Sequence, residues 1–395
     1  MTDHRPPGTP PVNEMATAFY GLGVGVIIFF IFWVAKGVIL PFIMAILLSF
    51  LIVSTKNFIE RLPAIGRLLP DTASFILAFA VIAIILLIMA LIIRENVQAV
   101  ISKAPEYQTR LTVILTNFVT WAGKVPYLPS DAVGMIEEII DGFRNGIVPS
   151  SVSDPTPGTT GDTLRRSAFR AAQSIVRTAT GTASNLLGSI VTVFLYTAFL
   201  LVERGRFSRK LTALAGAPSR RHELDAVISD ISRLVRTYIA TKSVINLSVA
   251  TISFVIMSII GIDFAGFWAL LIFVFGFIPI IGAVIAVMAP TLLALIQPDG
   301  SLSKAVLTLI MLTGTEQMIS SFVEPRVMGR NLNLSPLVIL ISLAVWGSIW
   351  GLVGMLLSVP LTVVALIVSS QFQATRPLAI LLSDNGEVAP IRTDR

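Results

Sequence analysis

Seven stretches of 19 or more residues contain no charged side chain, and this pattern restricts the fold more than any other feature of the sequence. The stretches are residues 15–35, 37–55, 72–93, 178–202, 243–262, 264–298 and 331–375. A helix needs roughly 20 apolar residues to cross a bilayer, so five stretches each suit one crossing, but the last two are too long for one straight helix. Only 13% of the residues are charged, against about 25% in soluble domains. We therefore predict an all-α polytopic membrane protein.

Side chains that could support catalysis or metal binding are scarce. The chain has no cysteine, and its two histidines, His4 and His222, form no metal-binding motif. No Walker-type phosphate loop is present, which argues against direct use of ATP. We therefore predict no enzymatic activity, no catalytic residue, no metal and no cofactor. A membrane scaffold is an alternative of another class, and a lipid enzyme is disfavoured because the acidic residues are scattered.

Basic residues predict the side of the membrane on which each loop lies. Nine lysines and arginines fall within residues 204–242, and a short basic loop covers residues 56–67. Such loops are usually cytoplasmic, so we assign the net charge of +6 to topology rather than to nucleic-acid binding and place both termini inside. The predicted parts are a cytoplasmic tail (1–13), three transmembrane helices (14–93), an extracytoplasmic insert of amphipathic helices (94–177) with a flexible linker (150–163), a transmembrane helix (178–202), a basic cytoplasmic amphipathic arm (203–242), a transport core (243–375) and a cytoplasmic tail (376–395).

The two longest stretches, 264–298 and 331–375, each carry helix breakers near the middle. If each enters the membrane and returns to the same side, Arg326 and Arg330 stay in the cytoplasm, as the charge rule favours. We therefore predict two broken or re-entrant hairpins among about eight membrane segments, with kinked spans as the alternative. An offset of roughly 70 residues between them suggests an inverted repeat. The predicted break residues, which mark candidate sites, are Pro279, Gly282, Gly347, Gly351 and Gly354.

One predicted span, residues 305–323, contains an ionisable side chain, Glu316. A charge inside a span costs about 2.5 kcal/mol or more and is usually kept for handling an ion or a substrate. We therefore take Glu316 as the candidate coupling group for H+ or Na+. In the alternative interpretation it lies near a helix end, solvated or paired with Arg326 or Arg330. The other transport candidates are the neutral polar residues Gln317, Thr313, Ser320 and Asn246.

Three motifs accompany these features, at residues 277–282, 324–336 and 351–360. Together they resemble the signature blocks of the autoinducer-2 exporter family, which is related to the PerM permeases, and the resemblance extends over nearly the whole chain. In the second motif we expect Glu324 to pair with an arginine at the inner end of its span. The predicted residues of this inner-end motif are Glu324, Pro325, Arg326, Gly329, Arg330 and Pro336.

The resemblance implies a homo-oligomer that either exports the autoinducer-2 signal or exchanges Na+ or Li+ for H+. Two departures of this sequence from the motifs of the family bear on that choice. The polar run before the second motif contains Glu316 and Gln317 but lacks the usual order of the family, and Ser335 stands where relatives often have histidine. The predicted function is a secondary transporter of a bacterial-type inner membrane that exports a small polar solute. Coupling to H+ or Na+, the substrate and the number of subunits stay open.

Overall fold

The computed structural model describes residues 29–61, 70–122, 188–203, 218–328, 333–372 and 375–387, together with residues 23, 25–27 and 206. Every regular element within these ranges is a helix. Five of the described helices are long and apolar enough to cross a membrane, and shorter apolar helices accompany them. The five are Lys36–Arg61, Asp71–Val100, Asp225–Ile260, Leu302–Val327 and Pro336–Gln371. The prediction of an all-α polytopic membrane protein is confirmed.

The first apolar helix, Gly25–Val34, leads directly into α2, Lys36–Arg61. The carbonyl of Ala35 accepts hydrogen bonds from the amides of Val38 and Ile39, so helical bonding resumes at once. The first two predicted transmembrane helices are therefore joined without a loop. α2 continues to the short basic connection and packs against α3.

The third predicted span forms the first part of α3, Asp71–Ala122, a single helix of 52 residues. At 1.5 Å per residue this helix is about 78 Å long, more than twice the thickness of the hydrocarbon core. Its second half therefore extends beyond the membrane, through the part of the sequence predicted to begin a separate insert of amphipathic helices. The charged residues that reappear after Arg94 change the surroundings of the helix but do not end it. The linker at 150–163 lies outside the described residues.

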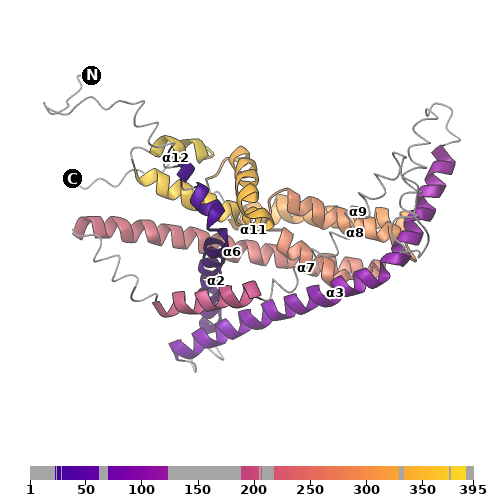
Figure 1. The fold of residues 1–395 in the computed structure, drawn as a ribbon, viewed down its shortest axis with the longest axis horizontal. Coiled ribbons are helices and arrows are strands. Elements are labelled where there is room, and N and C mark those ends of the chain that lie inside the picture. The colour runs from indigo at the N-terminus through magenta and orange to yellow at the C-terminus, as the bar shows by residue number, and fades with distance from the viewer. Residues whose placement is uncertain are drawn as a thin grey trace, which may run out of the picture.

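α6, Pro218–Ile260, runs through the centre of the molecule and contacts α2, α7, α9 and α11 (Figure 1). The predicted basic arm and the predicted fifth span are thus parts of one continuous helix. In Figure 1 the N-terminal end of α6 and the short helix α12, Arg376–Leu382, lie at one end of the molecule, and the C-terminal end of α3 lies at the other.

The first overlong stretch forms two short helices, α7 (Ala265–Phe275) and α8 (Ile281–Ile296). The 11 residues of α7 extend about 16 Å, roughly half the hydrocarbon core, so α7 cannot cross it alone. The two ends of the stretch meet, because the Gln297 side chain donates to the Gly261 carbonyl at 2.8 Å and accepts from the Asp263 amide at 3.1 Å. The chain therefore enters and leaves this hairpin at the same place.

The second overlong stretch forms α11, Pro336–Gln371, which reverses direction at Gly351. Gly351 has φ 60° and ψ −140°, a conformation that residues with a Cβ atom rarely adopt. Trp346 Nε1 donates to Thr362 Oγ1 at 3.3 Å, whereas a straight helix would hold these residues about 24 Å apart. α11 is therefore a pair of helices folded back on each other, not one 36-residue span.

Each hairpin has a close contact between a glycine just after its break and a backbone carbonyl just before it. A Cβ atom at Gly282 would lie 1.9 Å from the Phe275 carbonyl oxygen, and one at Gly354 would lie 1.9 Å from the Trp346 carbonyl oxygen. No side chain fits at such distances from a backbone atom. The two glycines are 72 positions apart, in agreement with the offset of the predicted repeat.

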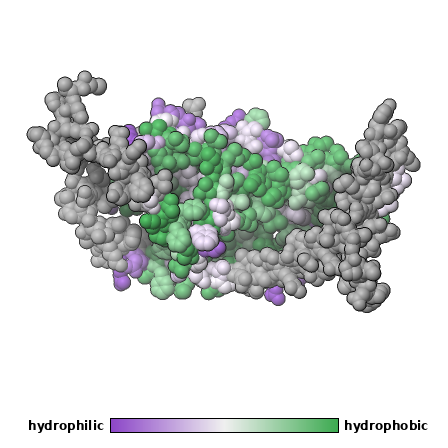
Figure 2. All heavy atoms as spheres, turned by 45° about the horizontal axis from the view of Figure 1, so that its top comes forward, coloured by the Kyte–Doolittle hydropathy of each residue, from purple (hydrophilic) through white to green (hydrophobic). Residues whose placement is uncertain are grey.

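Large apolar side chains are exposed on most of the described helices, among them Ile259 (81%), Leu302 (70%) and Val202 (76%). Figure 2 shows hydrophobic residues spread over the middle of the molecule, with polar residues mainly toward the margins. Soluble monomers rarely expose apolar patches of this extent. The surface thus suits contact with lipid.

Candidate functional site

A small pocket lies where the break between α7 and α8 meets α6 and α9, Leu302–Met318. The pocket also contacts the π-helical turn η1, Ile319–Val323, and the start of α10, Glu324–Met328. Two glycines of the break face it together with five polar side chains. These lining residues are Gly276, Gly282, Lys242, Asn246, Glu316, Ser320 and Glu324.

Asn246 of α6 connects the central helix to the break. Asn246 is only 3% exposed, and its Nδ2 donates to the Phe273 carbonyl at 3.2 Å. A Cβ atom at Gly276 would lie 2.6 Å from the Asn246 side chain, so the glycine makes room for the amide. Because a buried amide needs hydrogen-bond partners, this contact fixes the position of the end of α7 against α6.

A strained turn begins α8. Ile280 has φ 65° and ψ −58°, and the Ile281 amide donates to the Pro279 carbonyl at 2.7 Å, which is the geometry of a γ-turn with positive φ. This conformation is unfavourable for a β-branched residue. Strained backbone of this kind clusters at functional sites, so the turn supports the choice of this break as a site.

The helix that carries Glu316 widens one turn after it, where α9 passes into η1. In η1 the Glu324 amide donates a hydrogen bond to the Ile319 carbonyl, five residues earlier, whereas an α-helix joins residues four positions apart. Residues eight positions apart differ by about 80° around a regular α-helix, and a wider turn reduces that difference. Both Glu316 and Glu324 can therefore face the same pocket. Single π-helical turns are frequent at functional sites.

The three charged groups of the pocket are unequally paired. Lys242 Nζ lies 2.5 Å from Glu324 Oε1, with side chains 15% and 28% exposed. The Glu316 carboxylate has no hydrogen-bond or ion-pair partner among the residues that the structure describes. When all three groups are ionised, the pocket carries one uncompensated negative charge. An uncompensated carboxylate in a membrane span is costly, so a proton or a monovalent cation would be stabilised beside Glu316.

The partner of Glu324 differs from the arginine that the sequence suggested. Lys242 takes that place, because α6 continues unbroken from the basic arm into the span and brings the lysine one turn before Asn246. Sequence reasoning missed Lys242 because it counted this lysine among the basic residues of the cytoplasmic arm, 203–242. Its position at the boundary between the arm and the charge-free stretch was the signal that could have identified it.

The pocket is narrow. The space open to the centre of a water molecule is about 20 Å³, and a volume of about 10–15 Å³ is enough to hold one water. Pockets that enclose organic ligands are usually about 300–1,000 Å³. In this conformation the site therefore suits water, a proton or a small cation.

The predicted site residues fall into three groups in the structure. Five of them line the pocket, namely Glu316, Ser320, Asn246, Gly282 and Glu324. The others that the structure describes lie outside it: Gln317 and Thr313 on exposed faces of α9, Pro279 in the γ-turn, Gly347, Gly351 and Gly354 at the second hairpin, and Pro325, Arg326 and Pro336 along α10 and α11. Gly329 and Arg330 lie outside the described residues.

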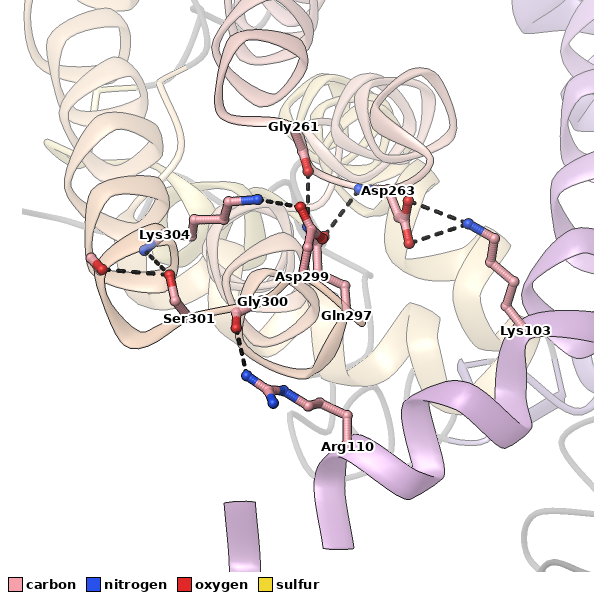
Figure 3. A network of polar contacts seen from close by, with 10 residues as sticks. Lys103, Arg110, Gly261, Asp263, Gln297, Asp299, Gly300, Ser301 and Lys304 are labelled. Carbon is pink, nitrogen blue, oxygen red and sulfur yellow. Dashed lines mark hydrogen bonds and ion pairs between the residues drawn. The ribbon is translucent and has the colours of Figure 1, made fainter. Parts of the chain in front are cut away.

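A second polar cluster holds α3 against the base of the first hairpin (Figure 3). Lys103 Nζ lies 3.4 Å from the Asp263 carboxylate, and the Tyr107 hydroxyl donates to the same carboxylate at 2.7 Å. Arg110 donates to the Gly300 carbonyl at 2.9 Å. The part of α3 that follows its candidate span thus contacts the turns before α7 and after α8. The sequence had not suggested these contacts.

Two side chains at the base of the first hairpin, Tyr107 and Asp299, have shifted pKa values. Burial and the hydrogen bond to Asp263 raise the pKa of the Tyr107 hydroxyl, so Tyr107 stays a neutral donor. Hydrogen bonds from Lys304, at 2.5 Å, and from Gln297 lower the pKa of Asp299. Near neutral pH Tyr107 is therefore neutral and Asp299 is ionised.

Comparison with known proteins places this architecture in a family. The sequence model of the AI-2E family transporters matches residues 22–374. The chain belongs to this family. The helices long and apolar enough to cross a membrane agree with this membership, and the names of the AI-2E relatives describe transport rather than catalysis.

Several relatives are similar over part of their length. The AI-2 transport protein TqsA of Escherichia coli K12 is 33% identical over 201 residues, which are 51% of this chain and 57% of TqsA. A Borreliella burgdorferi protein described as a transport protein is 31% identical over 49% of this chain and 53% of its own. The chain thus matches about half the length of these two relatives. YueF of Bacillus subtilis is 22% identical over 81% of this chain and 80% of its own length.

Proposed function

We propose that this AI-2E transporter is a secondary exporter of a small polar solute and that Glu316 couples the export to H+ or Na+. The proposal rests on the Glu316 carboxylate. It is unpaired, it belongs to a candidate membrane span, and it faces the pocket at the break between α7 and α8. Lys242 neutralises Glu324, which leaves Glu316 as the carboxylate that a mobile ion can neutralise.

The ends of the broken helix suit such a site. The C-terminal end of α7 carries partial negative charge, which favours a cation, and the N-terminal end of α8 carries partial positive charge, which favours oxygen atoms of a solute. We further propose that the two hairpins re-enter the membrane from opposite faces as an inverted repeat. Secondary transporters with such repeats place substrate and ion sites at the repeat interface and open them alternately to each side.

The proposed solute class follows from TqsA, whose name describes transport of AI-2. An autoinducer-2-like signal is therefore the first solute to test. The small volume of the pocket favours a second candidate function, exchange of Na+ or Li+ for H+, because only ions and water fit it in this conformation.

Transport by the purified full-length chain in sealed liposomes distinguishes these functions. We expect the molecules inserted inside out to carry AI-2 into these liposomes only under an imposed H+ or Na+ gradient, and uptake to stop when an ionophore dissipates the gradient. Sodium-driven H+ movement in the absence of solute would favour the antiporter. No gradient-dependent flux of AI-2, Na+, Li+ or H+ would overturn both candidates.

A further inference from the structure

A second cavity lies between α2 and α6, away from the pocket that contains Glu316. The space open to the centre of a water molecule in this cavity is about 290 Å³. Its lining residues are Ser54, Asn57, Phe58 and Arg61 of α2 and Arg236 of α6. The four α2 residues occupy positions i, i+3, i+4 and i+7 and so share one face of that helix. The cavity is large enough for a charged headgroup.

The two arginines have no acidic partner within the described part of the chain. The nearby acids are already engaged, because Lys56 Nζ lies 2.9 Å from Glu60 and 2.5 Å from Asp71. Two unpaired guanidinium groups, an amide and a hydroxyl around one cavity form a set of donors suited to a phosphate, which arginine binds with two parallel hydrogen bonds.

We propose that this cavity binds the phosphate of an anionic phospholipid headgroup. Phe58 lines the cavity and is 66% exposed, so it offers an apolar surface to acyl chains beside the phosphate donors. Arg61 is the last residue of α2, a helix long and apolar enough to span a membrane, and headgroups are expected at the end of such a helix. Basic pockets between transmembrane helices on the cytoplasmic side bind anionic headgroups in this way. A soluble phosphate shares this chemistry but would not use the exposed ring.

The test measures binding of phosphatidylglycerol to the purified full-length protein, by native mass spectrometry and by the increase in Tm that the lipid produces. Phosphatidylcholine and glycerol 3-phosphate are the comparison ligands. We expect the double variant Arg61→Gln/Arg236→Gln to bind phosphatidylglycerol roughly 10- to 30-fold more weakly than the wild type. The matched control is Arg233→Gln, which removes an arginine of the same helix that is paired with Asp230 and lies outside the cavity.

Each outcome bears on the proposal. Loss of binding in the double variant but not in Arg233→Gln supports it. Equal binding in the double variant and the wild type would overturn it. A loss in Arg233→Gln half as large on a logarithmic scale, as expected for one charge removed instead of two, would show that only net charge matters and would also overturn it. If glycerol 3-phosphate raises the Tm as much as the lipid does, the lipid assignment is wrong. Arg61→Lys/Arg236→Lys keeps the charge and should fold if the double glutamine variant does not; it should bind with intermediate affinity.

Discussion

Glu316→Gln is expected to abolish the accumulation of solute or ion that a proton or sodium gradient drives. If one ion moves with each solute, a tenfold gradient supports an accumulation of about tenfold, and the variant should reduce this to about one. The glutamine amide has nearly the same shape as the carboxylate, but it is uncharged, so it neither takes up a proton near neutral pH nor attracts a cation. The measurement is the steady-state accumulation ratio in liposomes under a fixed gradient.

The matched control for Glu316→Gln is Thr313→Val, one turn earlier on α9. Thr313 is exposed and lies outside the pocket, and valine has nearly the same shape. We expect this variant to keep the wild-type accumulation ratio. The coupling role of Glu316 would be contradicted if Glu316→Gln kept its full accumulation ratio, or if Thr313→Val lost as much as Glu316→Gln did.

Gly282→Ala is expected to destabilise the protein strongly, because its Cβ atom would lie 1.9 Å from the Phe275 carbonyl oxygen. A backbone atom cannot move aside without opening the hairpin, and overpacking of this kind typically costs about 1–3 kcal/mol or more. We expect the Tm in detergent to fall by roughly 5–10 °C. Gly354→Ala should have a similar effect, since its Cβ atom would meet the Trp346 carbonyl oxygen at the same distance.

Gly314→Ala tests whether the effect depends on the close contact or on glycine itself. A Cβ atom at Gly314 would have no neighbour within 4 Å among the described residues. Alanine is also the better helix former by about 1 kcal/mol, so the Tm should stay the same or rise slightly. If Gly282→Ala proved as stable as Gly314→Ala, the folding of the first hairpin described above would be incorrect.

Features that depend on local sequence were the most predictable. The charge-free stretches identified the membrane class, and the glycines and prolines within the two longest stretches marked positions where the structure reverses, at Gly351 and between α7 and α8. Glu316 stood out because it is an acid in an otherwise apolar span. The structure brings it together with Asn246 and Ser320, although their roles in transport stay predictions.

Features that depend on contacts between distant residues could not be predicted. Lys242 and Glu324 are separated by 82 positions and Lys103 and Asp263 by 160, so no local pattern relates them. A lysine near a span end looks like a solvated charge until the helix that carries it is placed. The continuity of α3 was also missed, because the change from apolar to amphipathic residues indicated the membrane boundary and was taken as the end of the helix.

The most direct test of the transport site is the reactivity of Ser320→Cys, the one thiol in a chain that has no cysteine of its own. Ser320 lines the pocket with Glu316, and the substitution changes little in size. We predict that a charged, membrane-impermeant thiol reagent modifies this residue from the cytoplasmic side, and that Na+ or a lowered pH changes the rate at least several-fold. Thr313→Cys lies outside the pocket on an exposed, apolar face of α9, where lipid is expected to exclude a charged reagent, so it should remain unmodified. If Ser320→Cys reacted from neither side, or at a rate independent of Na+ and pH, Glu316 would not lie on a transport pathway.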